Sequence, residues 1–241
     1  FGRTVADTAS LLQVIAGYDK KDSTSVNREM DIDAATLNTD VKGLKLGVPA
    51  EYFTGIDSEI KSLIENKIKE LEKLGAKIVP ISLKYTEYAI PVYYLIATAE
   101  ASSNLARYDG IRYGYRAADI KDLSSLYTST RSTGFGKEVK RRIILGTYSL
   151  SSGYYDAYYL KALKGRALLI EDFKNAFSLV DAIIAPVTTT TAFKIGEMSN
   201  DPLQMYMSDI LAISANLAGI PALSVPAGLD SKGLPVGIQV M

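Results

Sequence analysis

The sequence predicts an α/β fold: one domain whose mixed sheet has helices on both faces and carries a long helical insertion. Residues 44–81 have the pattern strand, amphipathic helix, strand, which predicts a βαβ unit with parallel strands and a right-handed crossover. Short apolar runs at 181–186, 222–225 and 236–240 predict three more strands. Residues 85–177 are mainly helical in pattern, so we expect them to form a subdomain or cap over the sheet.

The elements at the start of the chain follow from periodicity and from glycine. Apolar residues recur at helical spacing over 4–16, and Gly17 ends that helix. Residues 19–40 are polar and aperiodic, which predicts a surface connection. In the βαβ unit, the helix over 57–74 and the second strand are separated by Gly75. The apolar side of that helix consists of Ile60, Leu63, Ile64, Ile68, Leu71 and Leu74.

Glycine and proline also delimit the later elements. Glycines near 110–114, 134–136 and 153 break the helical insertion. Asp201 and Pro202 have the residue types of an N-cap and a first helical position, and we expect a helix from there to Gly219. Its apolar stripe is Leu203, Tyr206, Ile210, Ile213 and Leu217. The last two strands, joined by a glycine-containing loop, predict a hairpin.

The composition excludes several kinds of catalytic and metal-binding site. The 241 residues contain no histidine and no cysteine, which excludes a Ser-His-Asp triad, a Cys-His pair and a zinc site of imidazole or thiolate ligands within this chain. The 27 basic and 27 acidic residues balance, so net charge gives no reason to expect nucleic-acid binding. No apolar stretch is long enough for a bilayer span, and we expect a cytoplasmic protein without membrane association. The sequence starts without Met and ends on an apolar strand, so we expect a piece of a larger enzyme.

Two charged residues stand beside apolar stripes. Arg142 is spaced to lie on the same helix face as Phe135 and Val139, and Asp209 lies beside the stripe of the last helix. A charge turned toward an apolar face needs a partner of opposite sign. For both side chains, the spacing favours an internal ion pair. The alternative is that each binds a charged group of a ligand. An inward Arg and an inward Asp together suit the α-carboxylate and α-ammonium groups of an amino acid.

Two further groups of residues are weaker candidates. Residues 107–116 interleave arginine with tyrosine, which suits either RNA contact or a structural or subunit interface, and the latter is favoured. The serine pairs 102–103 and 151–152 are candidate nucleophiles. Neither pair lies in a G-x-S-x-G elbow or near a suitably spaced lysine, so ordinary helical serines are expected. Tyr93 is one of sixteen tyrosines and carries little signal by itself.

Read together, these segments resemble the amidase-signature family, and within it the A subunits of the amidotransferases that act on Glu-tRNA(Gln). The resemblance covers essentially the whole chain. It is carried by residues 100–105 (EASSNL), 107–114 (RYDGIRYG), 134–143 (GFGKEVKRRI), 151–159 (SSGYYDAYY) and 216–221 (NLAGIP). It implies an amidase-signature-like mixed sheet, with residues 1–241 as the C-terminal portion of a single amidase domain.

The resemblance also implies a function. The parent enzyme would hydrolyse glutamine through an acyl-enzyme, and its ammonia would convert Glu-tRNA(Gln) to Gln-tRNA(Gln) with partner subunits B and C. ATP and Mg would bind to one of these partners, with no cofactor in this chain. The family's Ser-Ser-Lys catalytic residues would lie upstream of Phe1, so this chain would contribute none and would be inactive alone.

By the same resemblance, three residues would hold glutamine. Arg142 would bind the α-carboxylate, Asp209 the α-ammonium, and Tyr93 would line the pocket. Arg141 adjoins Arg142, and a shift of one residue would exchange their roles. Two other readings remain: part of a stand-alone amidase acting on another amide, or a non-catalytic domain that docks a partner or tRNA.

Overall fold

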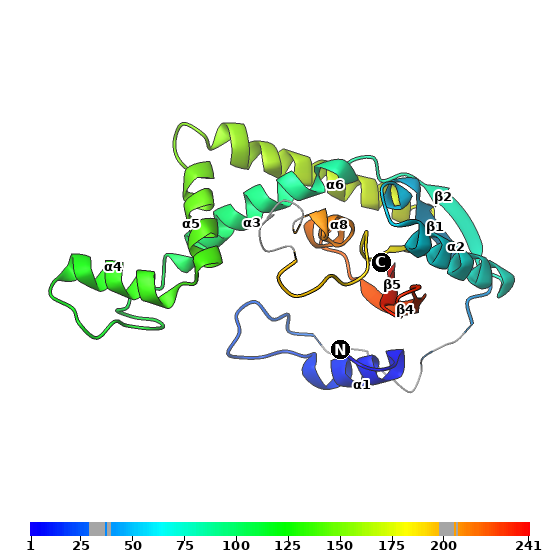
Figure 1. Cartoon of the computed structure of the whole chain (residues 1–241), viewed down its shortest axis with the longest axis horizontal. Coiled ribbons are helices and arrows are strands. Elements are labelled where there is room, and N and C mark those ends of the chain that lie inside the picture. Colours follow the sequence, from blue (N-terminus) through cyan, green and yellow to red (C-terminus); the bar gives the residue numbers. More distant parts are fainter. Residues whose placement is uncertain (29–36, 38–39, 198–204, 206) are drawn as a thin grey trace.

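The computed structural model describes residues 1–28, 37, 40–197, 205 and 207–241, and it has the α/β architecture that the sequence predicts. Its sheet has five strands in the order β2-β1-β3-β5-β4 (Figure 1). Their bounds are β1 Lys45–Pro49, β2 Lys77–Ile81, β3 Ala182–Pro186, β4 Leu223–Leu229 and β5 Pro235–Val240. Parallel pairing joins β1 to β2 and to β3, and antiparallel pairing joins β5 to β3 and to β4.

The predicted βαβ unit is confirmed. Its helix is α2, Ser58–Lys73, and the carboxylate of Asp57 caps it by accepting hydrogen bonds from the N–H groups of Glu59 and Ile60. The predicted hairpin of β4 and β5 is confirmed too, with a bulge between Pro226 and Gly228. The segments whose apolar runs predicted strands therefore form the strands of the sheet.

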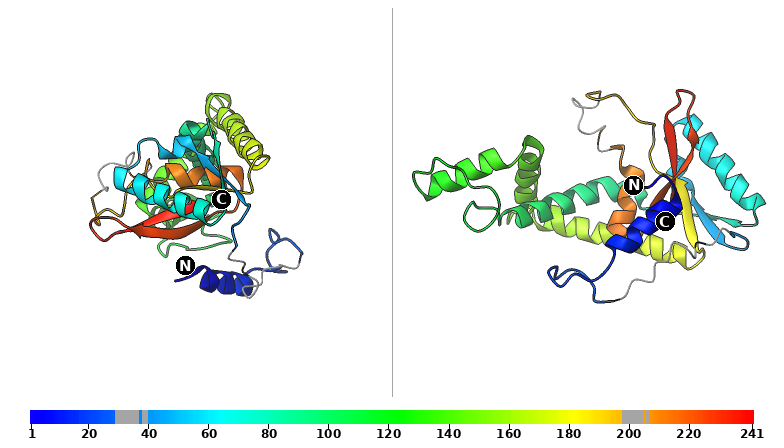
Figure 2. Two further views of the ribbon diagram at one scale, coloured as in Figure 1. Left: turned by 90° about the vertical axis from the view of Figure 1, so that its right-hand side faces the viewer. Right: turned by 90° about the horizontal axis from the view of Figure 1, so that it is seen from below.

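Helices cover both faces of the sheet (Figure 2). Ile183 and Ile184 of β3 are both buried, and because successive strand residues point to opposite faces they belong to different cores. On the face of Ile184 lies α2, which buries Ile60, Ile64 and Ile68. On the face of Ile183 lie α6, Lys161–Phe177, and α8, Ile210–Ala218. Gln239 joins this layer to β3, since its side-chain amide donates to the backbone oxygens of Pro186 and Leu211, at 2.8 and 2.9 Å.

The helical insertion forms a layer that extends away from the sheet (Figure 1). It consists of α3 Ala89–Leu105, α4 Leu123–Gly134, α5 Lys137–Ser149, the π-helical turn η4 Asp156–Leu160, and α6. Two short 3-10 turns, η2 Ala50–Phe53 and η3 Thr86–Tyr88, follow β1 and precede α3. Of the glycines expected to break the insertion, those at 110, 114, 136 and 153 lie between these helices, and Gly134 is the last residue of α4.

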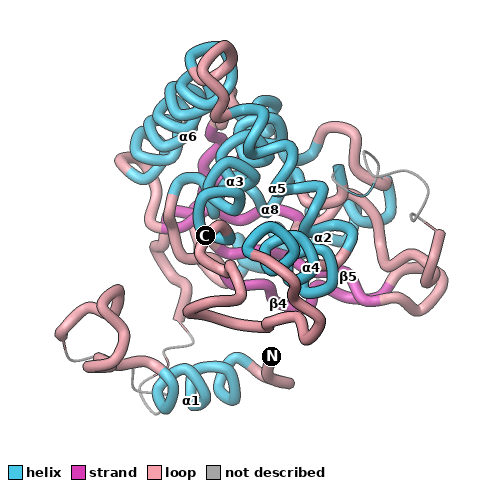
Figure 3. Tube along the Cα trace, turned by 90° about the vertical axis from the view of Figure 1, so that its left-hand side faces the viewer, coloured by secondary structure: helices cyan, strands magenta, loops and turns pink. Residues whose placement is uncertain are grey.

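The first helix, α1 Val5–Ile15, begins at a capping box formed by Thr4 and Asp7. Figures 1 and 3 show it beside the β4 and β5 end of the sheet, apart from the helical layer. None of its residues is buried. A cavity of about 400 Å³ lies between its apolar side, including Val5 and Leu12, and the strand ends at Leu223 and Val240.

Candidate functional site

Arg142 lies on α5, which begins at Lys137 after Gly136 as N-cap. The sequence reading placed Phe135 on the same helix face as Arg142, and that was wrong. Phe135 is the C-cap of α4, because its backbone is extended at φ −105° and ψ 129° and breaks the helical path between α4 and α5. Arg142 is therefore positioned by a helix that starts after the two glycines, as the sequence predicts, and that does not include Phe135.

One carboxylate holds both candidate arginines. Oε1 of Glu138 accepts a hydrogen bond from Nε of Arg142 at 3.2 Å, and Oε2 accepts one from Nη1 of Arg141 at 2.8 Å. The spacings are i,i+4 and i,i+3, so all three side chains share one side of α5. The arginine side chains are exposed to the same degree, 42% and 43%, so burial does not separate their roles. Neither is turned into an apolar core.

Asp209 is the N-cap of α8 and lies at its first turn rather than inside the helix as the sequence predicted. The difference arises because residues 208 and 209 form a turn after the helical residues 205 and 207, and the hydrogen bonds of α8 begin with the backbone oxygen of Asp209. Its exposed carboxylate makes no cap hydrogen bond. The expected helix start at Asp201 and Pro202, with Leu203 and Tyr206 of the stripe, lies outside the described residues.

Tyr93 lies on α3 with a half-buried ring packed edge-on against Tyr94, at a centroid distance of 5.2 Å. It lines a cavity of about 170 Å³ together with Glu100 of α3 and Arg166 of α6. Nε of Arg166 donates to the backbone oxygen of Leu217 at 2.8 Å and so stabilises the C-terminal end of α8. Tyr93 is thus next to the C-terminal end of α8, whereas Asp209 lies at the N-terminal end of that helix.

Helix α3 connects the three predicted residues. It carries Tyr93 and packs against α5, which carries Arg142, and against α8, which begins after Asp209. Between α3 and α5, the hydroxyl groups of Ser102 and Thr147 are 2.9 Å apart. Within the described part of the chain, no direct contact joins the side chains of Tyr93, Arg142 and Asp209. The arrangement places one cation and one anion on helices that border a common third helix.

Two residues that shape this region were not predicted as site residues from the sequence. Glu138 sets the direction of both arginines, and its spacing of four and three residues from them was the available signal. Gly146 sets the distance between α5 and α3, because a Cβ at this position would overlap the backbone carbonyl of Thr98. No local pattern indicates such a contact.

One serine of each candidate pair has a structural partner. The hydroxyl of Ser102 pairs with Thr147, and that of Ser151 donates to the backbone oxygen of Tyr148 at 2.7 Å. Among the described residues, no group of three or more carboxylate, imidazole or thiol side chains is arranged to hold a metal ion. No helix in the described part of the chain has the length and apolar character that crossing a bilayer requires.

Comparisons with known proteins agree over the whole chain. A family model described as amidase matches residues 1–241. The A subunit of glutamyl-tRNA(Gln) amidotransferase from Persephonella marina is 58% identical over 242 residues, which cover 100% of this chain and 50% of that protein. The protein of the same name from Chromobacterium violaceum is 55% identical over 240 residues, which cover 99% of this chain and 50% of that protein. This chain therefore spans about half the length of the curated relatives it matches.

Solved structures give the same result. The crystal structure of the A subunit of glutamyl-tRNA(Gln) amidotransferase from Thermotoga maritima is 40% identical, with a TM-score of 0.74, over 99% of this chain and 47% of that one. A bacterial aryl acylamidase of the amidase signature family has a TM-score of 0.70 at 21% identity over the same shares, which shows a common fold. The fold described above is thus shared with solved structures.

Proposed function

Because this chain belongs to the amidase family, we propose that it forms the substrate-gripping, C-terminal portion of the A subunit of a glutamyl-tRNA(Gln) amidotransferase. The observation that carries this proposal is the 58% identity over the full chain to a relative of that name. In this role the full-length protein is a glutaminase of the cytoplasm. Its ammonia serves the conversion of Glu-tRNA(Gln) to Gln-tRNA(Gln).

The proposed chemistry is acyl transfer. A serine attacks the side-chain amide of glutamine, ammonia leaves, and water then releases glutamate from the ester. The absence of histidine from this chain fits a serine activated by a second serine and a lysine rather than by an imidazole. We assign that Ser-Ser-Lys group to residues outside these 241. Partner subunits B and C receive the ammonia and the tRNA, and ATP and Mg are used on a partner.

In this proposal, Arg142 and Asp209 bind the two charged groups of glutamine. The ion pair with Glu138 uses Nε of Arg142, so the outer edge of the guanidinium, formed by Nη1 and Nη2, is left for a bidentate grip on the α-carboxylate. Asp209 presents an exposed carboxylate that makes no cap hydrogen bond and can accept from the α-ammonium. Tyr93 lines the pocket from α3.

A pair of arginine variants tests this proposal in the full-length protein. Truncating one partner of a charged contact with a ligand costs about 2–5 kcal/mol. We expect Arg142→Ala to raise KM for glutamine about thirtyfold or more while Tm changes little. Arg141→Ala is the matched control, because Arg141 pairs with the same carboxylate and is equally exposed. It should leave KM nearly unchanged.

Other outcomes of the same assay are informative. If the Arg141 variant alone raises KM, the two arginines exchange roles. If neither variant changes KM for glutamine, the proposed arginine grip is wrong. If the unsubstituted full-length protein does not hydrolyse glutamine, the substrate is another amide and the proposed glutaminase is wrong. If both lower stability and activity together, Glu138 and its arginines form a purely structural ion-pair group.

A further inference from the structure

Residues 106–142, hereafter the arm, project from the body of the protein. They comprise the loop after α3, helix α4 and the first turns of α5. Figure 1 shows α4 at the end of the molecule farthest from α2 and the sheet. A projecting segment of this kind is accessible to a large partner.

The arm is basic within a chain whose charges balance. It contains nine lysine and arginine residues and four carboxylates. Three of the carboxylates have internal partners. Asp109 accepts from the N–H groups of Ile111 and Arg112, Asp122 caps α4, and Glu138 holds two arginines. Backbone hydrogen bonds hold the pKa of Asp109 and Asp122 below the usual range, so both stay ionised and bound to the arm itself.

Several cations of the arm face solvent instead. Lys121 and Lys137 are exposed and pair with no carboxylate of the described residues, and the Arg112 side chain is 69% exposed. Its distance of 3.9 Å from Asp109 is too long for a hydrogen bond. All three side chains are thus exposed on the arm, and of the three only Arg112 has a carboxylate within ion-pair distance among the described residues.

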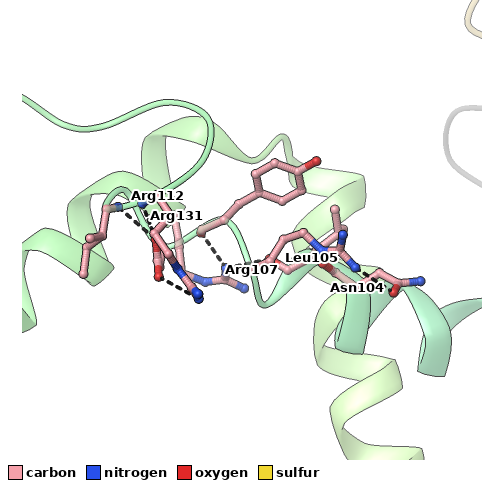
Figure 4. Close-up of polar contacts among 8 residues, drawn as sticks. Asn104, Leu105, Arg107, Arg112 and Arg131 are labelled. Atoms are coloured by element: carbon pink, nitrogen blue, oxygen red, sulfur yellow. Dashed lines mark hydrogen bonds and ion pairs between the residues drawn. The ribbon is translucent and has the colours of Figure 1, made fainter. Parts of the chain in front are cut away.

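The arm is also internally ordered. Arg131 of α4 donates from Nη1 to the backbone oxygens of Leu105 and Tyr108, both at 3.0 Å, and so ties the loop to the helix (Figure 4). The hydroxyl of Thr130 accepts from the N–H group of Ala117 at 3.2 Å. The cations are therefore held on a pre-formed surface, which lowers the entropic cost of binding.

The arm also contains an aromatic cavity. It measures about 170 Å³ and is lined by Tyr108, Tyr115, Thr130, Arg131, Gly134 and Phe135. Pockets for drug-sized ligands measure roughly 300–1,000 Å³, so this one suits a single flat ring system. The guanidinium of Arg131 lies 4.9 Å from the centre of the Phe135 ring. Tyrosine rings and an arginine plane are the groups on which unpaired RNA bases stack.

We infer that the arm is an RNA-binding surface in which Arg112, Lys121 and Lys137 contact phosphates and the cavity beside Tyr115 holds one unpaired base. The cations alone would suit an acidic protein equally well. The aromatic cavity decides for RNA, because stacking and phosphate contact together are typical of its recognition. This inference rests on the proposed function, in which the ammonia released from glutamine is used on an amino acid attached to a transfer RNA.

The test uses the full-length protein assembled with its partner subunits and a fluorescein-labelled tRNA transcript, with Kd measured at low and at roughly physiological concentrations of KCl. The triple variant Arg112→Gln, Lys121→Gln, Lys137→Gln should weaken binding and reduce the slope of log K against log salt by about one per lost phosphate contact. The matched control is Lys61→Gln, Lys69→Gln, Lys73→Gln on α2, which removes the same charge from exposed positions at the opposite end of the molecule.

Tyr115 tests the cavity separately. Loss of a stacked base by alanine substitution corresponds to about a five- to hundredfold weaker complex. We therefore expect that loss in Tyr115→Ala and near-normal binding in Tyr115→Phe, which keeps the ring. Equal affinities of the arm triple and the α2 triple would overturn the inference. So would arm variants that release partner subunits but keep RNA affinity, since the surface would then contact protein.

The same preparations separate this inference from the proposed function. Glutamine hydrolysis without RNA should be unchanged in the arm variants, because none of the substituted residues is assigned to the glutamine site. A parent protein that binds tRNA through the arm but never hydrolyses glutamine would refute the proposed function alone. If the protein hydrolyses glutamine but its affinity for tRNA is the same in the arm variants as in the parent protein, this inference alone is refuted.

Discussion

Gly146 of α5 lies directly against the backbone carbonyl of Thr98 in α3, so closely that any side chain at position 146 would overlap it. The contact sets the separation of the two helices that carry Arg142 and Tyr93. Beside it, the Ser102 and Thr147 hydroxyl groups meet at 2.9 Å. The relative position of the proposed glutamine-binding residues on these two helices therefore depends on the lack of a side chain at position 146.

Substitution of Gly146 by alanine tests this dependence. In an unobstructed helix the change would stabilise by about 1 kcal/mol, because alanine is the better helix former. Here overpacking against backbone should instead cost about 1–3 kcal/mol and displace α5. Urea unfolding measures the stability, and KM for glutamine reports the displacement. Gly153→Ala, at a position with open space around it, is the control. A stabilised Gly146 variant with normal KM would contradict the helix contact.

Glu138→Gln tests whether the shared carboxylate orients Arg142. Exposed i,i+3 and i,i+4 ion pairs contribute about 0.3–0.5 kcal/mol each, so stability should fall by less than about 1 kcal/mol. The guanidinium loses its charged anchor, and we expect KM for glutamine to rise about three- to tenfold. An unaltered KM would show that Glu138 does not position Arg142, whatever its effect on stability.

Asp172 of α6 gives a prediction for pH. The residue is 7% exposed, and its carboxylate accepts a hydrogen bond from the N–H group of Tyr85 at 2.9 Å. Burial raises its pKa above the ordinary 3.8, although the Tyr85 N–H and Lys84 act in the opposite direction and Glu51 and Glu171 add to the rise. The folded state thus holds this proton more tightly than the unfolded state. Its contribution to the free energy of unfolding therefore falls as pH rises from 3.8 through the folded pKa.

Asp172→Asn removes this titration while its side-chain oxygen can still accept from Tyr85. The free energy of unfolding of the variant, minus that of the parent protein, should be largest above the folded pKa of Asp172. This difference should shrink as the pH approaches 3.8. Urea unfolding of both proteins across this range measures the difference. A difference that stays constant with pH would show that Asp172 has the same pKa folded and unfolded.

The sequence predicted the strands, the βαβ unit and the helical insertion because each depends on local periodicity and on glycine or proline at its ends. It placed Asp209 inside a helix because an apolar stripe shows which residues share a face, without showing where backbone hydrogen bonding begins. Phe135 was assigned to α5 for the same reason. The proximity of α3 to α5 and α8 depends on contacts between distant residues, such as Gly146 and Thr98, which no local pattern carries.

The central claim is that Asp209 and Arg142 bind opposite charges of one glutamine molecule, and substrate analogues test it most directly. In the full-length protein, kcat/KM is measured for glutamine and for glutaramic acid, which lacks the α-ammonium, and for 4-aminobutyramide, which lacks the α-carboxylate. We predict that the parent protein prefers glutamine to each analogue by about thirtyfold or more. Asp209→Ala should lose only the preference over glutaramic acid, and Arg142→Ala only the preference over 4-aminobutyramide. Variants that keep both preferences would contradict the claim.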